Sequence, residues 1–435
     1  MQQRQSKVLF LISPNFGLLD NWLPILCELR KRRPDITITA LFPKTEIVSD
    51  INTAEITVRL GESIFNKVIF RSRAGFWVVT DSLAHAKELS AKSRNANEVI
   101  GKMRTALWLA RGFPLMRFFA MAADGIFAPV MRMLTGETHI SLSAIGAHTK
   151  AICFDIYAKT KKECRIILDS LPHTPRFSIM HGQAVSDFEP LRGGDYDRAY
   201  RTYPVTAYLF SKHEISAYRN NYVLKDSEMK VVGVPRYEPE WIEKISQESK
   251  KDIPASWDNY IFVVSRPATS YLFPREKKKE VLAYIKKLAF QDLHCKIVIK
   301  LRLSEYANKD GVYEEILGED THGKDWIYSS SHPFVLGKDS LFAITLYSGV
   351  SVDMLALGIP TIQMIEPKPK NARDHITEYK KLGLVLGADT YEELRDHAYN
   401  IMKRKNSVLV PLIAKYKEYF GPVGKPIREI TDDIY

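Results

Sequence analysis

The stretch Leu341–Gln363 constrains the fold of this chain most, because it predicts a complete strand–turn–helix–strand unit. The two expected strands, residues 342–346 and 361–365, contain mostly apolar and β-branched residues and no charge. Such strands are typical of a parallel sheet that is buried on both faces. Gly358 is suited to end the helix expected at about 350–357, and Pro360 prevents its continuation. The unit therefore favours an α/β fold.

The turn of this unit lies where a ligand would meet the end of a parallel strand. Ser348 and Ser351 offer hydroxyls, and Gly349, which follows Tyr347-Ser348, lets a ligand approach the backbone closely. The start of the next helix presents free N–H groups, which favour anions. Asp353 lies in the first turn of that helix, where a carboxylate either contacts a ligand or interacts with the helix dipole. An ordinary capped turn without a ligand has the same features. The residues at the other strand ends must therefore show whether this turn belongs to a binding site.

The same alternation of strands and helices recurs along the chain and indicates two domains. The expected strands of the first domain are residues 7–13, 36–42, 68–70, 151–156, 176–180, 207–211 and 229–232. Those of the second are residues 260–265, 296–301 and 326–328 and the unit above, before helices at 391–405 and 408–419. A chain of 435 residues also exceeds a single hydrophobic core.

We therefore expect two Rossmann-like, doubly wound parallel-sheet domains that face a central cleft. The first comprises residues 1–236, with a helical insertion at about 81–135, and the second comprises residues 258–435. The segment 237–257 between them is polar and charged and is the expected linker. The loop after the first strand lacks the G-x-G-x-x-G pattern, so a dinucleotide site is not indicated.

The composition limits the compartment and the partners. Four cysteines are widely scattered without a metal-binding spacing, which indicates a reducing, cytoplasmic compartment. The short apolar run at the N-terminus breaks at Pro14 and predicts a strand instead of a signal peptide, and no run of 18 apolar residues predicts a membrane span. The net charge of +11 leaves anionic small substrates, anionic lipid surfaces and nucleic acid as partners. Because the basic residues are dispersed, nucleic acid is disfavoured.

The segment 105–134 leaves two interpretations open. It mixes Trp, Phe, Met and Leu with three arginines. A basic, aromatic-rich helix pair can lie at a bilayer interface and bind anionic lipid, which would make the protein peripheral at the inner face of the plasma membrane. Alternatively, these residues cover the core of the first domain, as apolar helix faces usually do.

Polar side chains recur in the loops that follow the predicted strands of the second domain. In open α/β sheets, ligands bind outside the carboxyl ends of the strands. Lysine and arginine there would neutralise a phosphate or pyrophosphate. We call the candidate residues for binding this phosphate-bearing ligand the donor-binding residues. They are Ser265, Arg266, Lys300, Arg302, His332, Tyr347, Ser348, Gly349, Ser351, Asp353 and Glu366.

His181 is the candidate base on the opposite side of the cleft. It ends an apolar strand of the first domain, and a histidine is suited to take a proton from an acceptor hydroxyl near neutral pH. Asp187 and Asp195 in the following loop are the other candidates for this role. Acceptor contacts are expected from the residues around it and from the loop after the first strand: Gly182, Gln183, Asn15 and Gly17.

A metal requirement and a bound cofactor are not predicted. The sequence contains no H-E-x-x-H, no Walker A motif, no G-x-S-x-G and no D-x-D flanked by hydrophobic residues.

Three short motifs carry a resemblance to a known fold family. These are Gly233-Val234-Pro235-Arg236 at the end of the first domain, His181-Gly182 after a strand, and Tyr347-Ser348 followed by Asp353 and Gly358-Ile359-Pro360. Together with the two α/β halves they resemble GT-B glycosyltransferases. Within that fold the sequence is similar to bacterial surface-polysaccharide enzymes, the CDP-glycerol glycerophosphotransferases and the capsular Kdo or sialic acid transferases.

This resemblance implies a metal-independent glycosyltransferase that uses a nucleotide-activated donor of the CMP, CDP or UDP type. The acceptor would be a cell-surface glycan or a lipid-linked glycan. Two other readings remain open. One is an enzyme of the nucleotide-sugar 2-epimerase kind, which would need carboxylates around the sugar where this sequence places basic residues. The other is a non-catalytic basic protein that binds a membrane surface.

Overall fold

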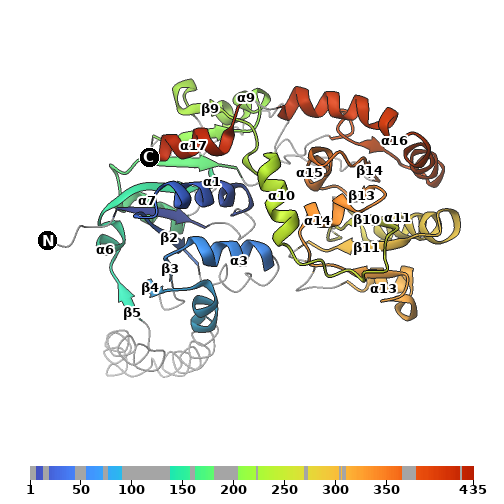
Figure 1. Cartoon of the computed structure of the whole chain (residues 1–435), viewed down its shortest axis with the longest axis horizontal. Coiled ribbons are helices and arrows are strands. Elements are labelled where there is room, and N and C mark those ends of the chain that lie inside the picture. The colour runs from blue at the N-terminus through green and yellow to red at the C-terminus, as the bar shows by residue number, and fades with distance from the viewer. Residues whose placement is uncertain are drawn as a thin grey trace, which may run out of the picture.

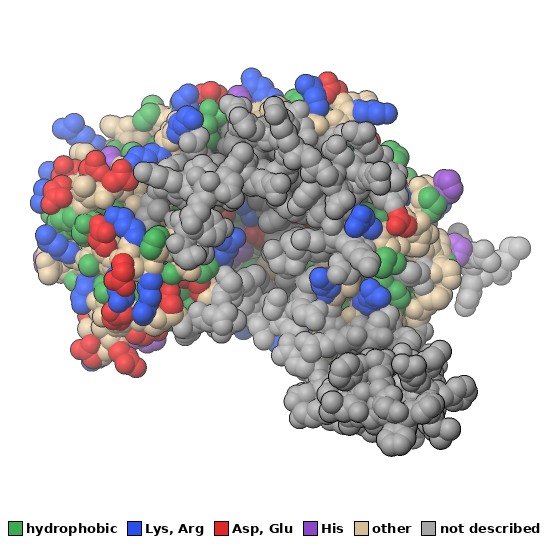
Figure 2. All heavy atoms as spheres, turned by 180° about the vertical axis from the view of Figure 1, so that it is seen from behind, with side chains coloured by type: hydrophobic (Ala, Val, Ile, Leu, Met, Phe, Trp, Pro, Cys, Tyr) green, Lys and Arg blue, Asp and Glu red, His purple; other side chains and the backbone are tan. Residues whose placement is uncertain are grey.

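The structure, a computed structural model, shows two α/β domains side by side (Figure 1). It describes residues 6–12, 19–44, 55–71, 77–90, 138–156, 162–180, 204–221, 224–268, 273–302, 305, 310–364, 379–421 and 424–435. The segment 105–134 lies outside these residues, so both interpretations of it stay open. Seen from behind, some described basic and acidic side chains are visible between the two domains (Figure 2).

The first sheet has nine strands within the described residues, in the order β5-β4-β3-β2-β1-β6-β7-β8-β9. Neighbouring strands are parallel except at β3/β4 and β4/β5, which are antiparallel. The strands are β1 (Lys7–Leu11), β2 (Thr37–Phe42), β3 (Lys67–Arg71), β4 (Trp77–Thr80), β5 (Thr138–Ile140), β6 (Thr149–Phe154), β7 (Arg176–Ile179), β8 (Thr206–Leu209) and β9 (Met229–Val231). The antiparallel edge of β4 and β5 was not predicted from the sequence, because its strands are short.

Strand β1 illustrates why this sheet is covered on both faces. Val8 and Phe10 pack in one core, with α1 (Leu19–Arg32) and α3 (Glu55–Ile64). Leu9 and Leu11 pack in another, with α7 (Lys162–Ser170) and α9 (Ile215–Asn221). Because successive side chains of a strand point to opposite faces, an uninterrupted apolar strand needs helices on both sides. A short helix, α6 (Leu142–Gly146), adds to the second face.

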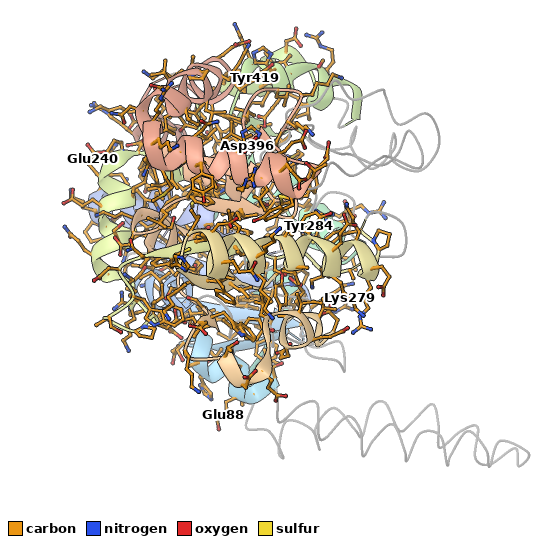
Figure 3. The ribbon with its side chains drawn as sticks, turned by 90° about the vertical axis from the view of Figure 1, so that its right-hand side faces the viewer. Glu88, Glu240, Lys279, Tyr284, Asp396 and Tyr419 are labelled. Atoms are coloured by element: carbon orange, nitrogen blue, oxygen red, sulfur yellow. The ribbon has the colours of Figure 1, made fainter. Side chains whose placement is uncertain are left out.

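The second sheet is parallel throughout, with six strands in the described part of the chain in the order β12-β11-β10-β13-β14-β15. The strands are β10 (Tyr260–Val264), β11 (Lys296–Lys300), β12 (Trp326–Tyr328), β13 (Ala343–Thr345), β14 (Thr361–Gln363) and β15 (Leu386–Gly387). The helices are α11 (Arg275–Lys287), α13 (Val312–Leu317), α14 (Pro333–Lys338), α15 (Val350–Ala356) and α16 (Tyr391–Phe420). Figure 3 shows α11, with Lys279 and Tyr284, beside α16, with Asp396, on the outer side of this domain.

The segment 237–257 contains a helix, α10 (Pro239–Glu248), which lies between the two domains (Figure 1). Trp241 and Ile245 on this helix are buried in the core that also includes Phe334 of α14. Pro239 occupies the first position of the helix, where its missing N–H costs nothing. The polar composition that indicated a linker thus belongs to the exposed face of an amphipathic helix.

The last helix, α17 (Pro426–Ile434), returns to the first domain and packs against α1 (Figure 1). Asp433 accepts hydrogen bonds from the Tyr208 hydroxyl at 2.9 Å and from Lys230 Nζ at 2.6 Å. Asp432 pairs with Arg32 of α1 at 2.5 Å. The end of the range 258–435 is therefore in contact with the sheet of the other domain. None of the helices in the described residues is long and apolar enough to cross a membrane.

Replacing Ile430 with alanine tests this return contact. Ile430 is fully buried in the core of the first domain, so we expect Ile430→Ala to lower the free energy of unfolding by about 2–5 kcal/mol. Urea denaturation followed by circular dichroism would measure the change. Arg428→Ala on the exposed face of the same helix is the control and should leave the stability nearly unchanged. Equal stability of both variants would contradict the docking of α17.

Candidate functional site

The order of strands reverses at one point in each sheet, between β1 and β6 and between β10 and β13. Ligands of open α/β sheets bind at such points, outside the carboxyl ends of the strands. In the second domain, Arg266 after β10 and Tyr347 after β13 meet there. Arg266 Nη1 donates a hydrogen bond to the carbonyl of Tyr347 at 3.2 Å, and its guanidinium lies 4.8 Å from the centre of the Tyr347 ring. Two of the predicted donor-binding residues are thus in contact across the point of reversal.

The turn after β13 has an unusual backbone at Tyr347, whose φ is +124°. A side chain at positive φ costs of order 1–3 kcal/mol, and such strain gathers at ligand-binding turns. The surrounding bonds hold the turn: Tyr347 N donates to Thr345 Oγ1 at 3.1 Å, and Ser348 Oγ accepts from Val350 N at 3.3 Å. Gly349 stands directly before α15. The sequence predicted the turn and the helix, and the strain at Tyr347 carries no sequence signal.

Ser351 is buried at the start of α15, with 1% of its surface exposed. Its hydroxyl has no hydrogen-bond partner among the described residues. Burying a hydroxyl without a partner costs about 1–3 kcal/mol, so native proteins rarely do so without a reason. A ligand at this turn would supply the missing partner.

Lys300, at the end of β11, is held by the backbone of the loop after β12. Its ammonium donates to the carbonyls of Ser330 at 3.1 Å and Ser331 at 2.8 Å. No carboxylate of the described residues lies within ion-pair distance of it. Burial lowers the pKa of Lys300 to about 8, against the opposing charges of Asp252 and Asp20. Lys300 is thus a cation that lacks a direct anionic partner among the described residues.

A cluster of charged groups joins the carboxyl ends of the two sheets. Arg236, which follows β9, donates to Asp20 of α1 at 3.1 Å and to Asp353 of α15 at 2.7 Å. The Tyr237 hydroxyl also donates to Asp353, at 2.6 Å. His332 caps α14 by accepting from Phe334 N through Nδ1, which leaves Nε2 to donate to Asp20 at 3.3 Å. The cluster therefore connects the first domain with the second.

The protonation of Asp20 reflects this environment. Burial opposes its ionisation, but the charges and hydrogen bonds of His332 and Arg236 outweigh burial and lower the pKa of Asp20 to about 2. A carboxylate with so low a pKa is a poor proton acceptor near neutral pH. Asp20 therefore serves to hold Arg236. Burial raises the pKa of Asp353, and the charge of Arg236 and the hydrogen bond from Tyr237 only partly oppose this, so the same argument does not apply to Asp353. Asp353 is also one of the predicted donor-binding residues, and that role stays a prediction beside its contacts with Arg236 and Tyr237.

Two other predicted donor residues lie at a second network, beneath the loops after β10 and β11. The Ser265 hydroxyl donates to Glu305 Oε1 at 2.6 Å and accepts a bond from the Tyr313 hydroxyl. Lys278 of α11, fully buried, pairs with the same carboxylate at 3.0 Å. The backbone N–H of Arg302 donates to Glu305 Oε2 at 2.9 Å, while the Arg302 side chain is exposed. Glu305 thus ties the two loops together.

The first-domain half of the predicted site lies outside the described residues. This applies to the candidate bases and acceptor contacts, and also to one donor residue: His181, Asp187, Asp195, Asn15, Gly17, Gly182, Gln183 and Glu366. Their roles stay predictions. The described strand end next to them is anchored, since Asn21 Nδ2 donates to the carbonyl of Met180 at 2.9 Å. Among the described residues, no group of three His, Cys, Asp or Glu side chains is placed to hold a metal ion.

Removing Arg236 should destabilise the folded chain. Arg236→Met would leave two carboxylates facing each other in a buried site, at a cost of roughly 3–5 kcal/mol. Adding Asp20→Asn and Asp353→Asn should restore part of that loss, because the uncompensated charges disappear. Chemical denaturation of the single and triple variants measures both effects. The exposed pair of Arg219 and Asp226 supplies the control, Arg219→Met, for which we expect little change. A triple variant no more stable than Arg236→Met would refute this account.

Comparison with known proteins places the chain by its fold. No family model and no curated protein sequence matches it. A putative UDP-N-acetylglucosamine 2-epimerase from Listeria monocytogenes superposes with a TM-score of 0.55 at 11% identity, over 99% of this chain and 96% of that chain. The wall teichoic acid polymerase TagF, in a variant soaked with CDPG, gives 0.56 at 12% identity, over 99% and 88%. Another UDP-N-acetylglucosamine 2-epimerase gives 0.53 at 10% identity, over 100% and 96%.

These similarities span both domains. Because the sequence identities are so low, they show the fold and do not show the function. The neighbours are GT-B enzymes, and the described residues have the features expected of that fold: two doubly wound sheets whose carboxyl ends face each other. The chain therefore has the GT-B fold, as its sequence predicted.

Proposed function

We propose that this protein is a glycosyltransferase that moves a sugar or a polyol phosphate from a nucleotide-activated donor to a bacterial cell-surface glycan. The observation that carries the proposal is the cationic edge of the second sheet. There Arg266 lies against the strained turn at Tyr347. Within the described residues, Lys300 lacks an anionic partner and the Ser351 hydroxyl lacks a hydrogen-bond partner. Cations beside a turn that opens a helix are suited to a nucleotide diphosphate.

The donor would bind with its phosphates at this edge. Lys300 would supply charge as a compact ammonium, while Arg266 offers a planar fork that matches phosphate oxygens. The leaving nucleotide carries negative charge away from the reacting centre, and fixed cations stabilise that charge as it develops. The proposal therefore assigns the neutralising role to side chains and requires no metal ion. The nucleotide is a substrate of the CMP, CDP or UDP type, and no cofactor is assigned.

His181 would act from the first domain. The acceptor hydroxyl attacks the transferred group, the bond to the nucleotide phosphate breaks, and the hydroxyl proton passes to His181. Gly182 and Gln183 beside it, with Asn15 and Gly17, would contact the acceptor. A lipid-linked acceptor would bring the protein to an anionic membrane surface, for which the segment 105–134 is the candidate contact.

The structural neighbours support a nucleotide-dependent enzyme and include both a polymerase soaked with CDPG and 2-epimerases of a UDP-sugar. The epimerase reading is the second candidate, because two of the three neighbours named above carry that name. Epimerisation would need carboxylates at the sugar. Both carboxylates described at the interface, Asp20 and Asp353, are engaged by Arg236. This engagement favours the transferase.

A nucleotide screen tests the proposed donor site. Thermal shift with CMP, CDP, UDP and GDP should give stabilisation by at least one of them. The double variant Ser348→Ala/Ser351→Ala should bind that nucleotide roughly 10- to 100-fold more weakly, since a hydrogen bond to a charged group is worth about 1.5–3 kcal/mol. Ser340→Ala is the matched control, because that hydroxyl bonds Gly337 at the opposite end of β13. Unchanged affinity in the double variant would remove this turn from the site.

Replacing the candidate base separates catalysis from donor binding. His181→Ala should lower turnover about 10²–10⁴-fold, because a positioned general base contributes that much, and should leave nucleotide affinity close to that of the native protein. Turnover with a defined acceptor and calorimetric titration of the nucleotide measure the two quantities. Near-normal turnover would exclude His181 and direct the test to Asp187 and Asp195. Sugar epimerisation without transfer in the native protein would favour the second candidate function.

A further inference from the structure

The segment that follows α10 reaches the donor side of the site at Asp252 and at Lys250, whose carbonyl lies 3.1 Å from Ser331 Oγ. The Asp252 carboxylate accepts four hydrogen bonds from three consecutive serines of the loop after β12. Oδ2 accepts from the backbone N–H of Ser330 at 2.7 Å and from its hydroxyl at 2.8 Å. Oδ1 accepts from the hydroxyls of Ser329 and Ser331. In return, Ser331 Oγ accepts from the N–H of Asp252 at 3.0 Å.

The same loop holds two groups of the candidate site. The carbonyls of Ser330 and Ser331 accept both described hydrogen bonds of the Lys300 ammonium, at 3.1 and 2.8 Å. An ammonium has three N–H donors, so within the described part of the chain one of them is left for a ligand. The residue that follows the serines is His332, which caps α14 and donates to Asp20. The direction in which these carbonyls and this ring point depends on how the serine loop is held.

We propose that Asp252 is a positioning residue for the donor site, which acts by holding the loop 329–331 so that its carbonyls fix the Lys300 ammonium. Asp252 does not touch the ligand in this account. The inference depends on the proposed function only for the identity of the anion that binds to Lys300. It makes the interdomain segment a part of the site, although that segment has no residue at a strand end.

We assign the main action of Asp252 to geometry, although its charge also raises the pKa of Lys300. Asp252 is exposed, so water weakens the effect of that charge. Its hydrogen bonds, by contrast, reach Lys300 through a single loop whose Ser329 and Ser331 are buried. Among the described residues, the other charge that acts on Lys300 is that of Asp20 from α1. It remains in place when Asp252 is replaced.

These two modes of action predict opposite results for Asp252→Ala. If the loop loosens, the Lys300 ammonium regains water, and its pKa should rise from about 8 by one unit or more toward 10.5. If Asp252 acts through its charge alone, the loss of that charge should lower the pKa of Lys300 below 8. Competitive acetylation of the ligand-free protein across pH 6–11, with peptide mapping by mass spectrometry, measures the pKa of Lys300 directly. A fall, or no change, would overturn the proposal.

The control is Asp339→Asn, which removes the partner of Lys251, the residue next to Asp252, without touching the serines. It should leave the pKa of Lys300 unchanged. A second variant, Ser330→Ala, loosens the loop more gently and covers the case in which Asp252→Ala fails to fold. It should shift the pKa of Lys300 in the same upward direction, and a native value there would also count against the proposal.

Binding gives an independent measurement with inorganic pyrophosphate as the probe. At pH 7, Asp252→Ala should weaken pyrophosphate binding about 10-fold in the native background and hardly at all in a Lys300→Met background, because the two residues act as a unit. An equal loss in both backgrounds would show that Asp252 acts elsewhere. If the native protein binds neither pyrophosphate nor any nucleotide, the proposed function fails, and the acetylation experiment still decides on Asp252.

Discussion

The contact of Arg236 with Asp20 and Asp353 is the interaction on which the arrangement of the two domains depends. Burying three charged groups is unfavourable unless each finds partners with good geometry, and here Tyr237 and His332 complete the set. The cluster lies where the carboxyl ends of both sheets face each other. It therefore sets the distance between the two halves of the candidate site. It also engages the carboxylates of Asp20 and Asp353, while Lys300 is a cation without an anionic partner within the described residues.

The topology explains why the site forms at this place. Each sheet reverses its strand order once, and at the reversal the neighbouring loops turn to opposite faces and leave room for a ligand. In the second domain Arg266 bridges this point to the strained turn at Tyr347. Beneath the adjoining loops, Glu305 and Lys278 form a buried pair that supports them. The residues that would contact a ligand are thus held in place by other residues that would not contact it.

Most of the fold could be predicted from the sequence. The strands 260–264 and 296–300 have uninterrupted apolar residues at their centres, and such strands must be buried on both faces of a sheet. The edge strands β4 and β5 are short and have no such signal. Of the candidate site, the strand ends were predictable, but side-chain directions were not. Ser265 follows a strand as expected, yet its hydroxyl bonds Glu305. Asp20 and Arg236, 216 positions apart, pair only after folding, so no local pattern could indicate them.

The return of α17 to the first domain has a mechanical consequence. Within the described residues the backbone crosses from one domain to the other twice, once between β9 and β10 and again along α16, whose Tyr419 ring lies against His213 of the first domain. Two bodies connected at one point can reorient in any direction, whereas two bodies connected at two points turn mainly about the line that joins them. Opening of the cleft would therefore occur mainly as a rotation about the line that joins the two crossings. Each crossing must bend whenever the distance across the cleft changes.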